Sequence, residues 1–541
     1  MSELPILTII TLLPLVSGII VAGLGEQKKL ARGLALFSSF VSLALVLVLW
    51  KNFNAASGEL QFAEKHEWIP TLGVNYFVAV DGLGLLMLLL TAVVTPMAML
   101  ASWKLVGTSS TSSHSLKIGD AVERVPTGHG AHLYFALMLF LQAGLFGTFT
   151  ALNFFHWFIF WELSLIPAFF LVRLWGGAQR APAATQFFVY TMVGSVAMLL
   201  AFLAIFLATG KFDFTELAEL GRNGTLASAL SAKLGWYSLN TKPLALIIFG
   251  GVLLGFAVKV PLMPFHTWLP ATYAEAPSGV TMLLTGVMSK MGVYGFIRIV
   301  LPIFAPQLNE PHVQTVLLWL AVITIVFSAC AAFAQRDLKR VLAYSSINHL
   351  GYCLLAVFAV SRYTGNDAAL ATEKAAALNG VFLQMFNHGL TAATLFWFVA
   401  LLEQRTGGLR GLNDFGGLRK VAPVFCGLMG IALFSSLGLP GLNGFVGEFL
   451  IFKGVFPLAP WAAAASVLGL LVTAIFILTI LQRVFNGPLN EKWSKLPDLT
   501  LAERALVAAP IALMFVLGIW PQLVLGVINS TAVKMVEQLK F

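Results

Sequence analysis

Charged residues are scarce in this chain. Asp, Glu, Lys and Arg make up only 11% of it, whereas soluble globular proteins carry about 25% charged residues. Hydrophobic residues make up 58%. This balance excludes a soluble enzyme and predicts a polytopic membrane protein. The formal net charge of +9 therefore reflects the loops between membrane spans and not affinity for nucleic acid.

Cysteines and cofactor motifs are also scarce. The three cysteines, Cys330, Cys353 and Cys426, are far apart and form no CxxC pair. An iron–sulfur or zinc site within the chain needs clustered ligands, so neither is expected. His129 and His132 lie in a polar loop without a third ligand, which does not predict a metal site. No nucleotide-binding loop is present either. The chain alone is expected to carry no redox centre.

Apolar runs long enough to cross a bilayer of about 30 Å are the dominant feature. They predict an all-α membrane protein with about fourteen spans. The expected limits are 5–23, 31–50, 82–102, 133–150, 153–172, 185–209, 243–264, 277–301, 313–334, 341–360, 378–402, 421–456, 461–485 and 504–530. The twelfth run is too long for one span and contains LPGLNGFVG, so it is predicted to be a broken helix. The polar stretch 211–242 predicts a short surface helix and a turn.

The loops predict the orientation of the chain. With the N-terminus outside, the loops on the cytoplasmic side contain more lysine and arginine than those on the other side. Basic residues in short loops favour the cytoplasmic face. Both termini are therefore expected on the non-cytoplasmic face.

The seventh span, LALIIFGGVLLGFAVKVPLMPFHTW, holds a lysine beside a helix break. Lys259 follows a long apolar run, and Pro261 and Pro264 come directly after it. Proline removes an amide donor and interrupts a helix. A charge at the bilayer centre costs roughly 3 to 17 kcal/mol, so it needs a partner or a water-filled path. Transporters place charged groups at the midplane in this way. The alternative is a lysine that snorkels from a helix end, which the apolar residues on both sides disfavour.

Few other ionisable residues lie within spans. With Lys259, they are Glu162, Lys290, His349, His388 and Glu448. A lone buried histidine is more often a packing residue. Six such groups in one protein favour a proton relay, because acids, lysines and imidazoles can exchange protons when water and neighbours change around them. Lysine can be discharged by desolvation, whereas arginine cannot. Glu162 is the expected partner of Lys259.

Two pairs of these residues recur at nearly the same spacing. Glu162 is followed by His349, and Lys259 by Glu448, each pair being separated by five helices. An odd number of spans inverts the second copy, which is the pattern of an inverted repeat. The expected units are 1–132 (helices 1–3 and a loop), 133–301 (helices 4–8, the first repeat), 313–485 (helices 9–13, the second repeat) and 486–541 (helix 14), with helices 7 and 12 broken.

Five segments resemble the antiporter-like membrane subunits of respiratory complex I. They are FFHWFIFWELSLIPAFFL, AVKVPLMPFHTWLP, EAPSGVTMLLTGVMSKMGVYGFIR, FAQRDLKRVLAYSSINHLGY and LGLPGLNGFVGEF. The resemblance implies a proton-translocating subunit of NADH:quinone oxidoreductase, driven by quinone reduction elsewhere in the complex. It implies an ion pair of Glu162 with Lys259, a central relay and an outlet at Glu448. The relay would contain Lys290, His349 and, as a further position, His388.

The resemblance is strongest to the M-type subunits, which have glutamate where the L and N chains usually have lysine, at the position of Glu448. It implies the L and N chains and small membrane subunits as partners, with FMN, iron–sulfur clusters and quinone in partner subunits. It also implies a prokaryotic plasma membrane or a thylakoid-type membrane. Two relatives share most of these residues and remain alternatives: Mrp-type sodium/proton antiporters and energy-converting hydrogenases.

One departure concerns the segment after the first break. Where the family usually reads WLPDAH, this chain reads WLPATY, from Trp268 to Tyr273. The acid and the imidazole are missing, which argues against proton entry at this loop.

Overall fold

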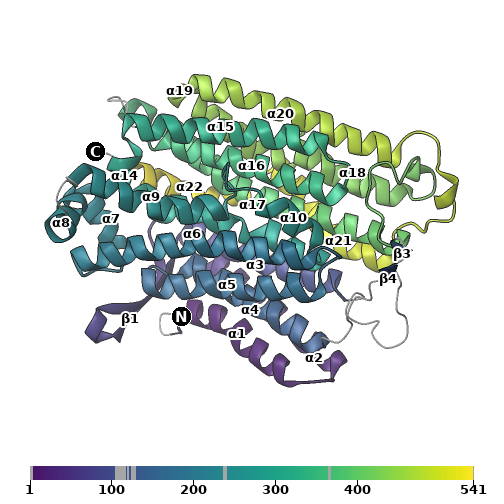
Figure 1. The fold of residues 1–541 in the computed structure, drawn as a ribbon, viewed down its shortest axis with the longest axis horizontal. Coiled ribbons are helices and arrows are strands. Elements are labelled where there is room, and N and C mark those ends of the chain that lie inside the picture. The colour runs from purple at the N-terminus through teal and green to yellow at the C-terminus, as the bar shows by residue number, and fades with distance from the viewer. Residues whose placement is uncertain are drawn as a thin grey trace.

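The computed structural model describes residues 4–103, 117–118, 121–122, 130–235, 241–362 and 367–539. Long helices lie roughly side by side and form one bundle (Figure 1). In the first half, the helices are α1 (Ile6–Gly23), α2 (Lys28–Asn52), α3 (Gly82–Ala101), α4 (Ala131–Thr150), α5 (Phe154–Trp175), α6 (Arg180–Thr209), α7 (Phe214–Arg222), α8 (Thr225–Leu234), α9 (Thr241–Lys259), α10 (Trp268–Glu275) and α11 (Ser278–Leu283).

The remaining helices are α12 (Lys290–Gly295), α13 (Leu301–Ile303), α14 (Ala305–Leu308), α15 (Pro311–Ala334), α16 (Leu338–Val360), α17 (Asp367–Thr406), α18 (Pro423–Leu437), α19 (Asn443–Leu458), α20 (Pro460–Ile480), α21 (Leu501–Ile519) and α22 (Gln522–Glu537). The strands are β1 (Gln61–Ile69), β2 (Val74–Val80), β3 (Lys117–Ile118) and β4 (Ala121–Val122). Short 3₁₀ turns are η1 (Pro70–Leu72), η4 (Leu418–Lys420) and η6 (Glu491–Trp493), and π-helical turns are η2 (Leu284–Met288), η3 (Phe296–Val300) and η5 (Leu481–Phe485).

Within the described residues, 13 helical segments are long and apolar enough to cross a membrane. The protein is therefore a polytopic membrane protein, as predicted. The expected span 421–456 is not among the 13, because it consists of α18 and α19, with 15 and 16 residues. The predicted break separates these two helices.

Neighbouring side chains satisfy the backbone at both breaks. Between α9 and α10, the Met263 amide donates to Thr324 Oγ1 at 3.0 Å, and the Trp268 indole donates to the Val258 carbonyl at 3.0 Å. Between α18 and α19, Asn387 Nδ2 donates to the Asn443 carbonyl at 2.7 Å. Irregular backbone survives at membrane depth only with such partners.

Three parts of the chain differ from the sequence-based expectation. An antiparallel hairpin of β1 and β2 follows α2; most of β1 is exposed, so it lacks the alternation that reveals a half-buried strand. The stretch 211–242 contains two helices, α7 and α8, where one was expected. The last span, expected at 504–530, ends at Ile519, and α22 begins after Pro521, because proline interrupts the helix.

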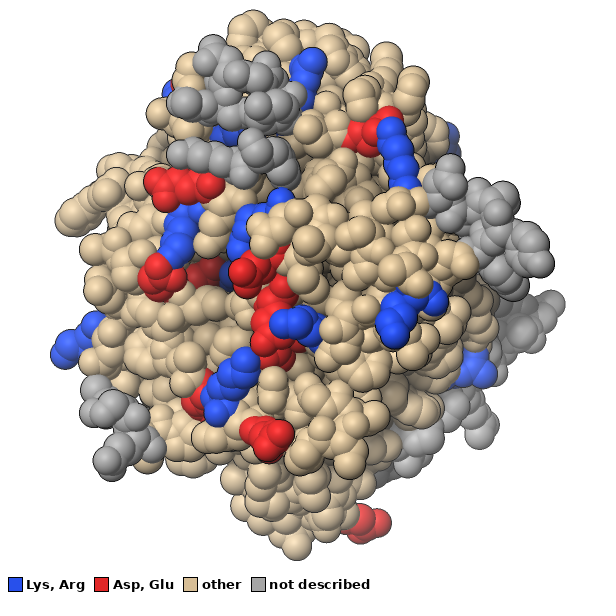
Figure 2. Space-filling model, turned by 90° about the vertical axis from the view of Figure 1, so that its left-hand side faces the viewer, with Lys and Arg blue, Asp and Glu red and all other residues tan. Residues whose placement is uncertain are grey.

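The two ends of the chain lie on the same side of the bundle. Helix α1 begins beside β1 and α22 ends near α14, both in the left half of Figure 1. Figure 2 shows this face, where basic and acidic side chains lie next to one another. Two of the ion pairs at these helix ends join Lys65 to Asp213 and Lys242 to Glu310, each at 2.7 Å.

Candidate functional site

Lys290 is fully buried at the start of α12, directly behind the π-helical turn η2. Its ammonium donates to the Thr285 carbonyl and lies 2.8 Å from His388 Nδ1. A π turn leaves carbonyls out of the regular α-helical ladder. The wider turn thus offers the Thr285 carbonyl to the ammonium as an acceptor in addition to His388 Nδ1.

Two glycines bring His388 to Lys290. Gly389 of α17 crosses Gly286 of η2 so closely that a Cβ on Gly389 would lie 2.5 Å from the Gly286 carbonyl oxygen. Helices approach this closely in membranes only through small residues. The crossing therefore fixes the contact between the imidazole and the ammonium.

Beyond Lys290, three more ionisable residues follow one another through neighbouring helices: His388 of α17, His349 of α16 and Glu448 of α19. The two imidazole rings have centroids 5.0 Å apart. His349 Nδ1 lies 3.0 Å from Glu448 Oε1, and His349 Nε2 lies 3.2 Å from Ser436 Oγ. All four residues are at most 7% exposed. We call Lys290, His388, His349 and Glu448 the buried row.

Lys259 and Glu162 lie apart from the buried row. The Lys259 ammonium lies 4.9 Å from the centroid of the Trp161 ring. Glu162 is close enough to interact with Lys259 electrostatically, but the described residues show no ion pair between them within 4.0 Å. Glu162 Oε1 is buried without a hydrogen-bond partner. The expected direct ion pair is therefore absent from this conformation.

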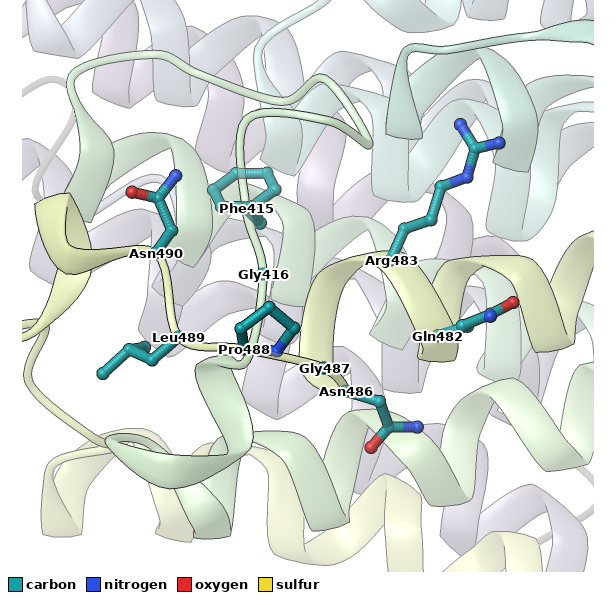
Figure 3. A pocket seen from close by; sticks show the side chains of 9 residues that line it. All are labelled: Phe415, Gly416, Gln482, Arg483, Asn486, Gly487, Pro488, Leu489 and Asn490. Atoms are coloured by element: carbon teal, nitrogen blue, oxygen red, sulfur yellow. The ribbon is translucent and has the colours of Figure 1, made fainter.

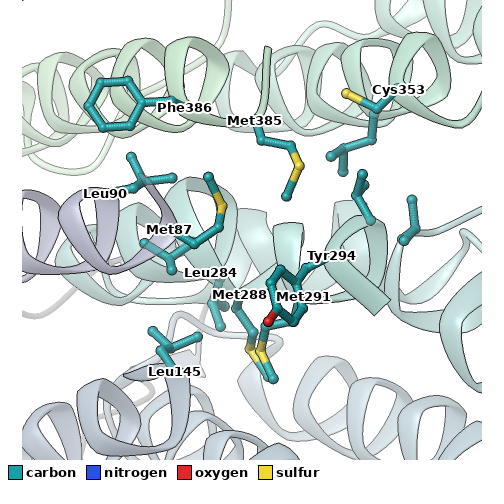
Figure 4. Close-up of a cluster of buried hydrophobic side chains, with 14 of the residues drawn as sticks. Met87, Leu90, Leu145, Leu284, Met288, Met291, Tyr294, Cys353, Met385 and Phe386 are labelled. Carbon is teal, nitrogen blue, oxygen red and sulfur yellow. The ribbon is translucent and has the colours of Figure 1, made fainter. Parts of the chain in front are cut away.

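Apolar side chains surround the helix that carries Lys290. Figure 4 shows Met288 and Met291 of this helix facing Leu145, with Met87 and Met385 from neighbouring helices close by. These five side chains are at most 3% exposed. The hydrogen-bond partners of Lys290 therefore lie in its own turn and at His388 of α17.

Sequence reasoning missed several polar neighbours of the row. Gln384 Nε2 lies 3.3 Å from His349 Nδ1 and donates to Glu448 Oε1 at 3.2 Å, so it holds both groups. The other missed neighbours are Ser436, Asn387 and Asn443, which, like Gln384, are polar but carry no charge. Counting every polar residue in the apolar runs, and not only the titratable ones, would have found them.

Other features do not add to this site. A surface hollow of about 780 Å³ lies between the loops 415–416 and 486–490, and Arg483 is its only charged lining residue (Figure 3). No group of three or more His, Cys, Asp or Glu within the described residues could hold a metal ion. His132 is among the described residues, and His129 lies outside them.

The fold and the buried row define a class: helical membrane proteins that keep ionisable groups in contact inside the bilayer. The profile of one family, described as "NADH:quinone oxidoreductase/Mrp antiporter, TM", matches residues 151–475. The chain belongs to this family.

Relatives agree over nearly the whole length. The chain is 34% identical over 533 residues to F(420)H(2) dehydrogenase subunit M of Methanosarcina mazei, and the match covers 98% of each chain. It is 32% identical over 547 residues to NADH-quinone oxidoreductase subunit M of Mycobacterium tuberculosis, covering 98% of this chain and 93% of that one. The predicted resemblance to M-type subunits is confirmed.

Two solved structures have the same fold over nearly the whole length of this chain. A chain of respiratory complex I from Thermus thermophilus with bound NADH matches with a TM-score of 0.80 at 27% identity, covering 99% of this chain and 100% of that one. A chain of the Mrp complex from Dietzia sp. matches with a TM-score of 0.78 at 19% identity, covering 98% and 97%. The second likeness concerns the fold alone.

Proposed function

We propose that this chain is a proton-translocating membrane subunit of a complex I-type quinone oxidoreductase. Its work would be driven by quinone reduction in other subunits. The observation that carries the proposal is the buried row, in which Lys290 lies 2.8 Å from His388 and His349 lies 3.0 Å from Glu448. Ionisable groups inside a membrane are costly and mark ion or proton paths.

The proposed transfer runs along the row. Lys290 gives a proton to His388 Nδ1, which accepts it as the unprotonated nitrogen of a neutral imidazole. His388 then releases a proton from its other nitrogen towards His349, and His349 gives one to Glu448. After these steps Lys290 is neutral, Glu448 carries one additional proton and each imidazole is in its other tautomer. The row returns to its starting state when Lys290 takes up a proton, Glu448 releases its proton to water and both imidazoles reverse their tautomers. Glu448 is the outlet in this scheme.

Lys259 and Glu162 would control loading of the row. An acid that moves close to an ammonium favours its charged form, and one that moves away favours proton release. Here the ammonium faces the Trp161 ring at 4.9 Å, a contact worth about 0.5 to 2 kcal/mol. We assign this conformation to the state in which Glu162 has withdrawn.

We further propose the inverted repeat of helices 4–8 (133–301) and 9–13 (313–485), flanked by 1–132 and 486–541. The proposed fourteen spans are the 13 apolar helical segments of the described residues together with α18 and α19 taken as one broken span. Two matching backbone bridges support the repeat. Phe154 N donates to the Phe212 carbonyl at 2.9 Å and Phe214 N to the Leu152 carbonyl at 2.8 Å. In the second unit, Leu338 N donates to the Arg410 carbonyl at 2.9 Å and Leu412 N to the Arg336 carbonyl at 2.7 Å.

The repeat is not exact in its ionisable residues. Asn153 and Asp337 cap α5 and α16. Counted from these caps, Ser346 corresponds to Glu162, and His349 lies about one turn further along. Lys259 precedes its helix break, whereas Glu448 follows its own. The two units would thus share a backbone plan while placing different groups in the proton path.

The same proposal names the surroundings of the chain. Other antiporter-like chains, L and N, and small membrane subunits would be its partners in a prokaryotic plasma membrane or thylakoid-type membrane. FMN, iron–sulfur clusters and quinone would lie in partner subunits. Both termini would face the non-cytoplasmic side.

Reconstitution of the intact complex in proteoliposomes tests this function against the Mrp alternative. We expect electron-donor oxidation and quinone reduction to drive proton movement at the same rate with and without sodium. Sodium-dependent proton exchange without quinone reduction would instead assign the chain to an antiporter complex. An energy-converting hydrogenase would pump with hydrogen evolution and without quinone.

A further inference from the structure

Tyr273 occupies the place at which the family usually has histidine, and it reaches the surroundings of Lys290. Its side chain is 1% exposed. Its hydroxyl donates to the Leu284 carbonyl at 3.0 Å, in the π-helical turn η2 that also contains Thr285 and is followed by Ser289. Ser289 Oγ in turn lies 3.5 Å from the Lys290 ammonium. Tyr273 therefore contacts the turn that directly precedes Lys290 of the buried row.

Further hydroxyls extend this contact. Thr285 Oγ1 lies 3.0 Å from Ser346 Oγ of α16, and Ser289 Oγ donates to the Thr285 carbonyl at 3.1 Å. All of these groups are at most 2% exposed. We call Tyr273, Thr285, Ser289 and Ser346 the hydroxyl cluster.

The C-terminal end of α10, which carries Tyr273, lies against charged residues at the membrane edge. We call Glu275, Asp337, Lys339, Glu403 and Arg410 the edge cluster. Arg410 bonds to Asp337 at 2.5 Å and to Glu403 at 3.3 Å, and lies 3.6 Å from Glu275. Lys339 pairs with Glu403 at 3.0 Å.

The edge cluster leads from solvent inwards. The side chains of Arg410 and Asp337 are 25% and 26% exposed, whereas Lys339 is only 5% exposed. Arg410 donates to the Ala274 carbonyl at 2.7 Å, and Lys339 donates to the Ala276 carbonyl at 3.4 Å. Tyr273 thus lies between a partly exposed group of acids and the buried row.

A purely structural role does not account for this arrangement. Helix α10 is already anchored at its start by Trp268, whose indole bonds to the Val258 carbonyl, and at its end by Arg410 and Lys339. The Leu284 carbonyl alone would satisfy the phenol. The hydroxyls of Thr285, Ser289 and Ser346 are already hydrogen-bonded to one another or to backbone carbonyls, so they do not need the phenol as a partner.

We propose that Tyr273 is a proton-relay residue that connects the edge cluster to Lys290; this rests on the proposed function. The phenol turns from the Leu284 carbonyl and gives its proton to the Thr285 or Ser289 hydroxyl. At the same time it takes a proton from a hydronium ion on its other side, which leaves neutral water. That hydroxyl passes a proton to a neutral Lys290. No charge remains on Tyr273, and the excess proton comes from the bulk solvent along water that enters past Glu403 and Thr281.

Thr281 lies on this entry route. Its hydroxyl reaches the carbonyls of Tyr273 at 3.3 Å and Ala276 at 3.2 Å. It therefore places one polar group between the edge cluster and the hydroxyl cluster. The loss of the acid and imidazole from the WLPDAH pattern is thus compensated by Tyr273 itself and by acids of the edge cluster.

The test uses the intact complex with Tyr273→Phe, which removes one oxygen. Tyr134→Phe is the matched control, because Tyr134 is also fully buried and its hydroxyl contacts Ser102 Oγ at 2.9 Å. We expect coupled quinone reduction to fall on the order of tenfold with Tyr273→Phe. The solvent deuterium isotope effect should rise, because proton supply becomes limiting. Tyr134→Phe should change neither quantity.

Tyr273→His provides the rescue, since an imidazole can also relay a proton. We expect this variant to recover most of the rate. A wild-type rate with Tyr273→Phe, or a slow Tyr273→Phe variant that Tyr273→His does not rescue, would overturn the proposal. If the Tyr273→Phe complex fails to assemble, Thr285→Val replaces it, with a slower rate expected and an unchanged rate overturning the proposal. Lys290→Met separates the two proposals when Tyr273→Phe leaves pumping unchanged. If Lys290→Met leaves pumping unchanged as well, the proposed function fails. If Lys290→Met stops pumping, only the role of Tyr273 fails.

Discussion

His349 Nδ1 and Glu448 Oε1 lie 3.0 Å apart, although the residues come from different spans, α16 and α19. Gln384 donates to the same carboxylate oxygen at 3.2 Å. A buried pair of this kind contributes little to stability, because desolvation offsets most of the attraction. Its value is more easily explained by proton exchange between an imidazole and a carboxylate.

Glu448→Gln tests this exchange. The amide keeps the size and the hydrogen-bonding oxygen of the side chain but cannot take up a proton. We expect coupled quinone reduction and proton pumping to fall about tenfold or more, with normal assembly. Glu448→Asp should retain partial activity. A fully active Gln variant would mean that Glu448 only accepts hydrogen bonds from its neighbours.

Glu162→Gln tests the control of Lys259. The structure shows Lys259 over the Trp161 ring, without a direct pair to Glu162. If the carboxylate must approach during the cycle, Gln should slow pumping strongly, and Asp should slow it less. Rates are measured in proteoliposomes that contain equal amounts of assembled complex. Equal rates for Gln and Asp would contradict a role for the charge.

Gly389→Ala tests the crossing that positions His388. The added methyl group would lie 2.5 Å from the Gly286 carbonyl oxygen, so α17 must move away from Lys290. We expect lower activity and a loss of about 1 to 3 kcal/mol of stability from overpacking. Gly250→Ala is the control, because nothing lies within 4 Å of its added Cβ. Similar melting temperatures and rates for both variants would contradict the assigned contact.

Asp498 provides a test outside the membrane spans. Its carboxylate accepts from the amides of Val424 at 3.0 Å and Phe425 at 2.9 Å, which caps α18. Burial favours a higher pKa, but the backbone donors of Val424, Leu499 and Phe425 outweigh it, so the pKa of Asp498 lies below 3.8.

The sign of the pH effect follows from this lowered pKa. The stabilisation is complete above pH 3.8 and is lost as the pH falls through the lower folded-state value. We expect Asp498→Ala to cost about 1 kcal/mol near neutral pH. Its melting temperature should approach that of the wild type at acidic pH. A difference that does not depend on pH would contradict the cap.

The spans and breaks were predictable because hydrocarbon tolerates few charges, which makes Lys259, Lys290 and Glu448 conspicuous in the sequence. Their contacts were not predictable. The distance between Lys290 and His388 depends on a π-helical turn and on the approach of Gly286 to Gly389. Neither feature has a distinctive local pattern, because glycine is common in membrane helices.

The polar neighbours were missed for a different reason. Gln384 is neutral, so a search for titratable groups passes over it. Tyr273 was noticed only as a missing histidine, because the sequence does not show that its hydroxyl reaches the turn before Lys290. The strand β1 was missed because its mostly exposed side chains carry no periodic apolar signal.

The most direct test of the buried row uses proteoliposomes that contain the complex with Lys290→Met. Two quantities are measured: the rate of coupled proton movement and the number of protons moved per electron transferred. Lys374→Met is the matched control, because Lys374 is also buried and its ammonium donates to the Arg362 carbonyl at 2.7 Å, away from the row. We predict that Lys290→Met lowers coupled proton movement about tenfold or more while Lys374→Met remains within about twofold of the wild type. Unchanged quinone reduction and an unchanged proton-to-electron ratio in the assembled Lys290→Met complex would contradict the account.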